Sequence, residues 1–197
     1  GDIKAGFTYA FSDRAMLGVI VLMMLSVLFG HSYNTLMPAW AREALDIQSD
    51  GLGMLMLIMG VGALVGTLGL AGIQKVSHRG LVLLGSCMIW GVGLAAFSQV
   101  TDYWITMPFL MLIGSVSSVV MSLTMTVILS VASPEMRGRM MAITMMSFGA
   151  MPLSSLPFGA LAEAWDSTAD ALFVSGVLLV AVTLVLTAGY PAIRRLN

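Results

Sequence analysis

Six long stretches of the sequence contain no Asp, Glu, Lys or Arg, and they decide what the chain can fold into. They cover residues 15–37, 51–73, 80–101, 104–131, 140–162 and 171–193. A helix needs about 20 apolar residues to cross the roughly 30 Å hydrocarbon core of a bilayer. Since lipid offers no partner for backbone N–H and C=O groups, segments that cross it must be helical. The sequence therefore predicts an all-α integral membrane protein with six transmembrane helices.

The composition excludes several other classes of protein. Only 10% of the residues are charged, whereas a soluble domain carries about a quarter, and the net charge of −1 gives no reason to expect a nucleic-acid partner. Cys87 is the only cysteine and lies inside the third stretch, so we expect no disulfide, metal site or cofactor. Residues 1–14 lack the apolar core of a signal peptide; we expect them to form an amphipathic cytoplasmic lead-in.

The charged residues predict how the helices are oriented. Eight of the nine basic residues fall on one side of the predicted membrane: Lys4, Arg14, Lys75, Arg79, Arg137, Arg139, Arg194 and Arg195. Arg42 lies on the other side, together with most of the acidic residues. Short loops rich in Lys and Arg stay in the cytoplasm, so both termini are predicted to be cytoplasmic. Trp40, Trp104 and Trp165 end spans on the opposite side, where indole rings favour the membrane interface.

The connections predict how the six helices are organised. The longest covers residues 38–50, and no soluble domain separates the stretches. Six helices divide naturally into two groups of three, and the second group must then enter the membrane from the opposite side. This 3+3 inverted repeat is the arrangement of many secondary transporters.

Glycine and proline mark two of the predicted helices. Gly62 and Gly66 are four residues apart in the second stretch, a spacing that lets two helices approach closely in lipid; a direct contact with substrate is the alternative. Pro152 and Pro157 lie in the fifth stretch, where each removes a backbone hydrogen bond and favours a kink. Such kinks are tolerated where neighbouring groups or a cavity satisfy the freed backbone.

Polar residues within the stretches are candidates for a substrate cavity. No stretch contains a carboxylate, and His31 is the only ionisable side chain of the kind that marks an ion or proton pathway. The candidates are His31, Tyr33, Asn34, Trp90, Ser118 and Ser122. The alternatives are a polar helix end that reaches headgroups around His31, packing for Trp90, and hydrogen bonds between helices for the serines of the fourth stretch.

The segment PEMRGR, residues 134–139, joins the fourth and fifth stretches. Ser133 is expected to cap a short helix with Pro134 at its first position, and Gly138 is expected to permit a tight turn. One interpretation is that Arg137 and Arg139 only keep this loop in the cytoplasm.

A second interpretation comes from a family resemblance. The segments IKAGFTYAFSDRAML, LMPAWAREALDIQSDGLGMLMLIMGVGALVGTLGL and SPEMRGRMMAITMMSFGAMPLSSLPFGALAE resemble the C-terminal half of a major facilitator superfamily transporter, in the bacterial drug and siderophore branch that includes the enterobactin exporter. The resemblance implies a twelve-helix protein. It also implies that Arg137, Gly138 and Arg139 hold one gating state. Ser77 stands where the family's loop signature would place an aspartate.

These observations predict a transporter and no enzyme. We expect the C-terminal half of a major facilitator-type secondary transporter in the bacterial cytoplasmic membrane, exporting a small amphipathic organic compound by alternating access. Its partner would be an N-terminal half, a second copy, or a larger membrane complex. The alternative is an accessory or structural subunit that packs against such a complex without moving solute. No cluster of nucleophile and base, phosphate loop or set of metal ligands is present in the sequence.

Overall fold

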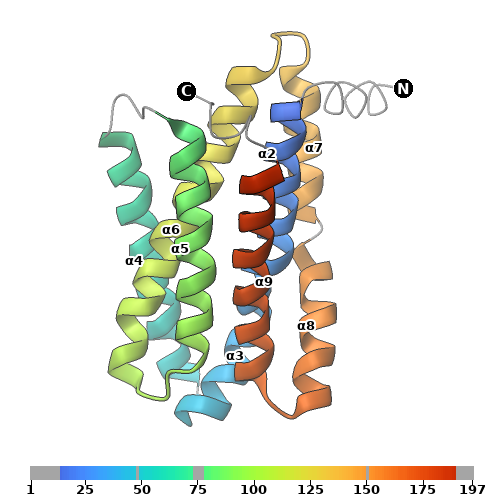
Figure 1. The fold of residues 1–197 in the computed structure, drawn as a ribbon. Helices are drawn as coiled ribbons and strands as arrows, with labels where there is room; N and C mark the ends of the chain where they lie inside the picture. Colours follow the sequence, from blue (N-terminus) through green and yellow to red (C-terminus); the bar gives the residue numbers. More distant parts are fainter. Residues whose placement is uncertain (1–13, 48, 73–77, 150, 190–197) are drawn as a thin grey trace.

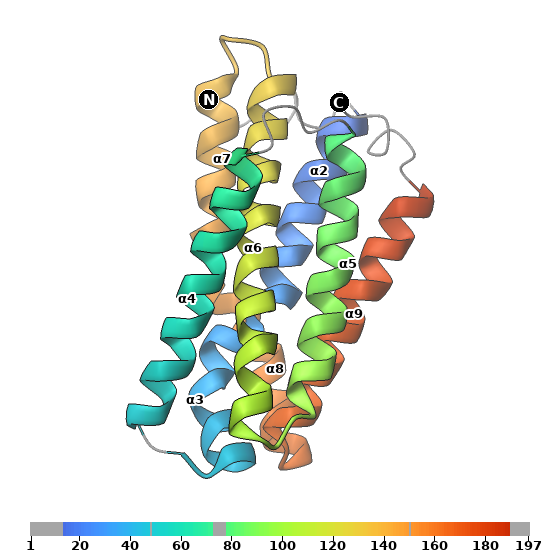
Figure 2. The same ribbon diagram turned by 90° about the vertical axis from the view of Figure 1, so that its left-hand side faces the viewer.

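A computed structural model describes residues 14–47, 49–72, 78–149 and 151–189. Helices make up this part of the chain and run roughly side by side as an upright bundle (Figures 1 and 2). In chain order they are α2 (Arg14–Leu25), the π-helix η1 (Ser26–Gly30), α3 (Ser32–Leu45), α4 (Ser49–Gly72), α5 (Arg79–Ser98), α6 (Tyr103–Val131), α7 (Arg137–Gly149), α8 (Met151–Trp165) and α9 (Thr168–Gly189). The all-helical prediction is confirmed for these residues.

Among the described residues, five helical segments are long and apolar enough to cross a membrane. They are Leu17–Leu45, which joins α2, η1 and α3, then Asp50–Gly72, Arg79–Ser98, Tyr103–Val131 and Thr168–Gly189. The predicted fifth span, residues 140–162, is divided between α7 and α8 on either side of residue 150. A sixth crossing and the inverted repeat therefore stay predictions. The lead-in at residues 1–13 and the end of the last span, residues 190–193, lie outside the described residues.

The first span is longer than the sequence predicted. Residues 38–50 were expected to form a loop, but α3 continues through Pro38 to Leu45 and ends at Asp46, which adopts a left-handed conformation with φ 51°. The hydropathy falls after Met37, whereas the following Ala, Arg, Glu and Leu residues have high helix propensity. Loss of hydropathy therefore marked the end of the apolar stretch and not the end of the helix.

Three helix pairs dominate the packing. α4 packs mainly on α6, and α5 packs between α6 and α9. A Cβ atom at Gly62 would lie 2.8 Å from the backbone carbonyl carbon of Met111, and at Gly66 it would lie 2.7 Å from the Ser118 hydroxyl oxygen. The close approach of α4 and α6 therefore requires glycine at both positions, which is the geometry that their spacing predicts.

The two ends of the bundle carry different charges. The first turns of α2, α5 and α7, at the upper end in Figure 1, contain Arg14, Arg79, Arg137 and Arg139. At the lower end, Glu43 of α3 accepts hydrogen bonds from the Thr168 backbone N–H at 3.0 and 3.1 Å through its two carboxylate oxygens. This carboxylate caps the positive N-terminal end of α9 and ties the first span to the last.

Trp40 differs from the other two tryptophans predicted at the interface, because its side chain faces the interior of the bundle. Its side chain is fully buried, its ring centroid lies 4.3 Å from that of Phe97, and its Nε1–H donates to the Ser98 carbonyl at 3.1 Å. Because α3 extends past residue 37, Trp40 reaches the interior of the bundle. Trp104 and Trp165 are 74% and 50% exposed, as residues facing lipid or headgroups would be.

Candidate functional site: a buried polar centre in the first span

The first span is interrupted near its middle. Residues 26–30 form a π-helix, and the backbone at His31 leaves helical geometry with φ −91° and ψ 0° before α3 begins. A π-helical turn inserts one extra residue into an α-helix and occurs often at functional sites. It changes the direction of the side chains that follow it. Nothing in the letters SVLFG predicts this turn.

His31 and Trp90 meet at the interruption. His31 is 8% exposed and Trp90 is fully buried; their ring centroids lie 5.0 Å apart with an interplanar angle of 73°. Gly30 makes room for the indole, since a Cβ atom there would lie 2.7 Å from Trp90 Cζ2. The interruption therefore places an imidazole edge-on to an indole in the interior of an apolar bundle.

Hydroxyl groups surround this pair and bond to other groups. Ser32 Oγ lies 2.9 Å from Ser175 Oγ of α9 and 3.0 Å from the Phe29 carbonyl oxygen. Ser26 Oγ and Cys87 Sγ share a hydrogen bond at 3.6 Å. By contrast, His31 Nδ1 and Trp90 Nε1 have no hydrogen-bond partner in the described part of the chain. The serine hydroxyl groups therefore have hydrogen-bond partners, whereas these two ring nitrogens do not.

Tyr33 extends the polar centre toward α6. Its side chain is 3% exposed, its ring centroid lies 6.2 Å from that of His31, and its hydroxyl interacts with the side chains of Ser117 and Asn34. Asn34 itself is exposed. Of the predicted cavity residues, the structure thus gathers His31, Tyr33, Asn34 and Trp90 in one region.

Ser118, a cavity candidate, makes the hydrogen bond between helices that was the alternative to that role. Its Oγ lies 3.0 Å from the carbonyl oxygen of Ala63 on α4 and 2.8 Å from that of Ser115, so it joins two helices. Ser122 is half-buried one turn further along α6. The hydroxyl of α6 that interacts with Tyr33 belongs to Ser117, which the sequence analysis did not select.

The predicted gating residues lie at two places along α7 and α8. Met136 and Arg137 donate their backbone N–H groups to the Ser133 carbonyl, and α7 begins at Arg137. Gly138 is therefore helical, and no described glycine has a positive φ, so the tight turn expected there is wrong; the turn precedes it. Arg139 Nη1 lies 3.5 Å from Met136 Sδ.

Pro152 and Pro157 are both exposed residues of α8. Pro152 is the second residue of that helix, where its missing N–H costs nothing, and α8 continues through Pro157. Phe158 of α8 packs edge-on against Phe29 of η1 with ring centroids 6.1 Å apart, so η1 and α8 are in contact.

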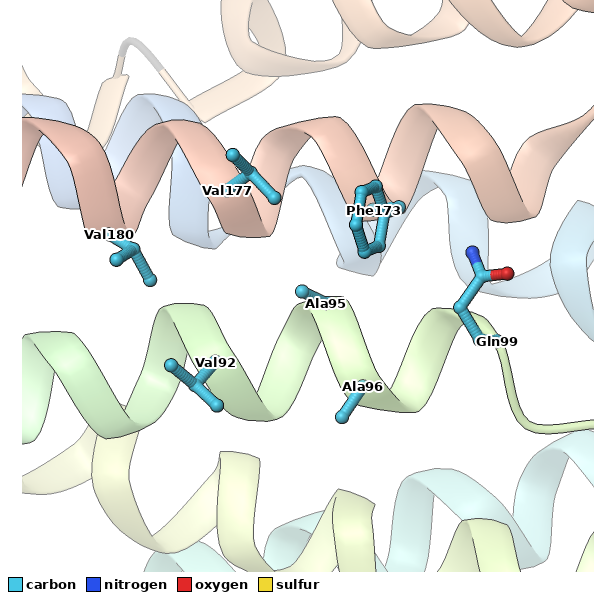
Figure 3. Close-up of a pocket in the computed structure, with 7 residues that line it drawn as sticks. All are labelled: Val92, Ala95, Ala96, Gln99, Phe173, Val177 and Val180. Carbon is cyan, nitrogen blue, oxygen red and sulfur yellow. The ribbon is translucent and has the colours of Figure 1, made fainter.

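A second feature is a groove between α5 and α9 on the flank of the bundle (Figure 3). It has a volume of about 390 Å³ and is lined by Val92, Ala95, Ala96, Gln99, Phe173, Val177 and Val180. Gln99 is its only polar side chain, and neither His31 nor Trp90 lines it. Within the described residues no three His, Cys, Asp or Glu side chains come together in a way that could hold a metal ion.

Comparison with protein families matches residues 1–194, nearly the whole chain, to the transmembrane secretion effectors. The chain belongs to this family of the major facilitator superfamily. Membership supports an integral membrane protein with a transporter-type function, and it agrees with the five hydrocarbon-length segments of the bundle. Neither curated proteins nor solved structures gave a match.

Proposed function

We propose that this transmembrane secretion effector is the C-terminal half of a secondary transporter that exports a small amphipathic organic compound by alternating access. The observation that carries the proposal is the interruption of the first span, where His31 contacts Trp90 of α5 and each ring has one nitrogen without a hydrogen-bond partner in the described part of the chain. Broken helices in transporters commonly surround the substrate near the middle of the membrane. A drug or siderophore is the substrate class that the sequence resemblance favours.

The interruption of the first span also indicates where the bundle changes shape. The break in regular helical hydrogen bonding at η1 gives this span a place to bend, because only a few backbone groups must change there. The contact between Phe29 and Phe158 couples η1 to α8. In this proposal α7 and α8 together make the sixth crossing, and Arg137 and Arg139 hold the cytoplasmic end in one gating state.

An efflux measurement tests the export function. Cells lacking their own exporters would express the complete reading frame and be loaded with a panel of fluorescent amphipathic dyes. We expect His31→Ala to weaken export of a transported dye about two- to twelvefold in apparent affinity, which corresponds to one lost neutral hydrogen bond. The matched control is His78→Ala, because His78 is exposed and precedes α5.

Arg137→Ala should slow the same efflux by disturbing the gate. If no dye is exported, or if both variants export as fast as the wild type, the transport proposal fails and an accessory role in a larger membrane complex replaces it. Expression at the membrane would be checked by blotting for every variant.

We also propose a bacterial cytoplasmic membrane location with both termini inside the cell. In a Cys87→Ala background, a cysteine replacing exposed Arg137 should resist a membrane-impermeant maleimide until the cells are permeabilised. A cysteine replacing exposed Asp170, at the opposite end of the bundle, should react in intact cells. The reverse labelling pattern would invert the proposed orientation.

A further inference from the structure

The two nitrogens without a hydrogen-bond partner belong to two rings that contact each other, those of His31 and Trp90. In the described part of the chain, His31 Nδ1 and Trp90 Nε1 are the buried side-chain polar atoms without a hydrogen-bond partner. Leaving one such atom unpaired costs about 1–3 kcal/mol. Two of them in adjacent rings, with centroids 5.0 Å apart, point to a shared polar ligand.

The chemistry of the two nitrogens defines the ligand. Indole Nε1–H can only donate a hydrogen bond, and neutral imidazole Nδ1 accepts one when its proton is on Nε2. A group that accepts from Trp90 and donates to His31 satisfies both atoms, and a hydroxyl does this with one oxygen.

The neighbouring side chains do not supply a hydrogen-bonding group for the two nitrogens. Ser26 is paired with Cys87, and Ser32 is paired with Ser175 and the Phe29 carbonyl. Gly30 packs directly against the indole and has no side chain that could bond to either nitrogen, because even a Cβ atom there would overlap the ring. The surrounding apolar residues strengthen any hydrogen bond made there, since water does not compete for it.

We propose that His31 and Trp90 together bind one O–H group, which accepts a hydrogen bond from Trp90 Nε1–H and donates one to His31 Nδ1. The O–H group comes either from a bound water molecule or from an alcohol or phenol of the transported compound. The second source rests on the proposed export function, whereas the first does not.

The hydrogen-bonding state of the Trp90 indole tests the site without any transport assay. Ultraviolet resonance Raman spectra of the purified protein in detergent report whether an indole N–H is hydrogen-bonded. Subtracting the spectrum of Trp90→Phe isolates Trp90 from the other tryptophans. Spectra would be recorded with and without 4-butylphenol, a small amphipathic probe that carries one hydroxyl.

Each outcome decides the proposal. A hydrogen-bonded Trp90 signal without probe, unchanged by the phenol, identifies water as the O–H source. A signal that becomes hydrogen-bonded only with the phenol identifies a hydroxyl of the ligand. A Trp90 N–H that stays free under both conditions overturns the site, whether or not the protein exports anything.

Variants separate the site from a general effect on folding. His31→Phe keeps an aromatic ring against Trp90 but removes the acceptor, so it should weaken phenol binding about two- to twelvefold, equivalent to one neutral hydrogen bond. His78→Phe, at an exposed histidine, should leave binding unchanged. Phenol bound equally tightly by His31→Phe and wild type would exclude the ligand hydroxyl. Circular dichroism and size-exclusion chromatography would verify that each variant is folded.

Discussion

Replacing Gly62 with alanine should loosen the bundle at the contact between α4 and α6. The added Cβ would lie 2.8 Å from the Met111 carbonyl carbon and nearer still to its oxygen, whereas real Cβ atoms essentially never approach within 3.0 Å. The obstacle is backbone, so no side chain can turn away and the helices themselves must move apart.

The expected cost follows from this overlap. Forcing one extra methyl into a packed contact costs about 1–3 kcal/mol. For a chain of this size, that corresponds to a fall of about 2–12 °C in the unfolding midpoint. Since α4 packs mainly on α6, it has little other contact within the chain to compensate for the loss.

The matched control is Gly60→Ala on the same helix. A Cβ there would meet nothing within 4 Å, and alanine has the higher helix propensity by about 1 kcal/mol. Thermal unfolding in detergent, followed by tryptophan fluorescence, would compare the two variants with wild type. An unchanged midpoint for Gly62→Ala, or an equal fall for Gly60→Ala, would refute the close-packing argument.

Three further substitutions test the polar contacts and the interrupted span. Glu43→Ala should lower the unfolding midpoint, because it leaves the Thr168 N–H without its acceptor. The expected loss of stability is about 0.5–2 kcal/mol, the usual contribution of a helix cap. A midpoint equal to that of wild type would contradict the cap. Gly30→Ala should displace the Trp90 ring and shift its fluorescence maximum, and no shift would mean that the ring has room. Trp40→Phe should cost about 1 kcal/mol through the lost indole hydrogen bond, measured by the same unfolding experiment.

The bundle was largely predictable because its surroundings leave few options. Uncharged stretches of hydrocarbon length must be helical to cross a membrane. Glycines four residues apart favour close packing of two helices, as Gly62 and Gly66 show between α4 and α6. Helix ends were less predictable, because hydropathy reports the extent of the membrane and helix propensity reports the extent of the helix. At α3 the two differ by the segment from Pro38 to Leu45.

The polar centre was only partly predictable. Residue type alone selected His31 and Trp90, and the fold brings them into contact. Ser117, which interacts with Tyr33, was not selected, because helical periodicity tells which residues share a face but not which neighbouring helix that face contacts. The π-helical turn has no sequence signal of its own, since its extra residue is stabilised by the contacts around it.

That extra residue has a consequence for the length of the first span. An inserted residue would turn an ordinary α-helix by about 100°, but the wider π-turn at Ser26–Gly30 takes up the extra residue as a local bulge. Deleting one residue from this segment and closing an ordinary helix would therefore leave α3 in nearly its present register against α2, with Glu43 still at the start of α9. The irregular backbone at His31 would be lost, whereas the contacts at the two ends of the span would remain.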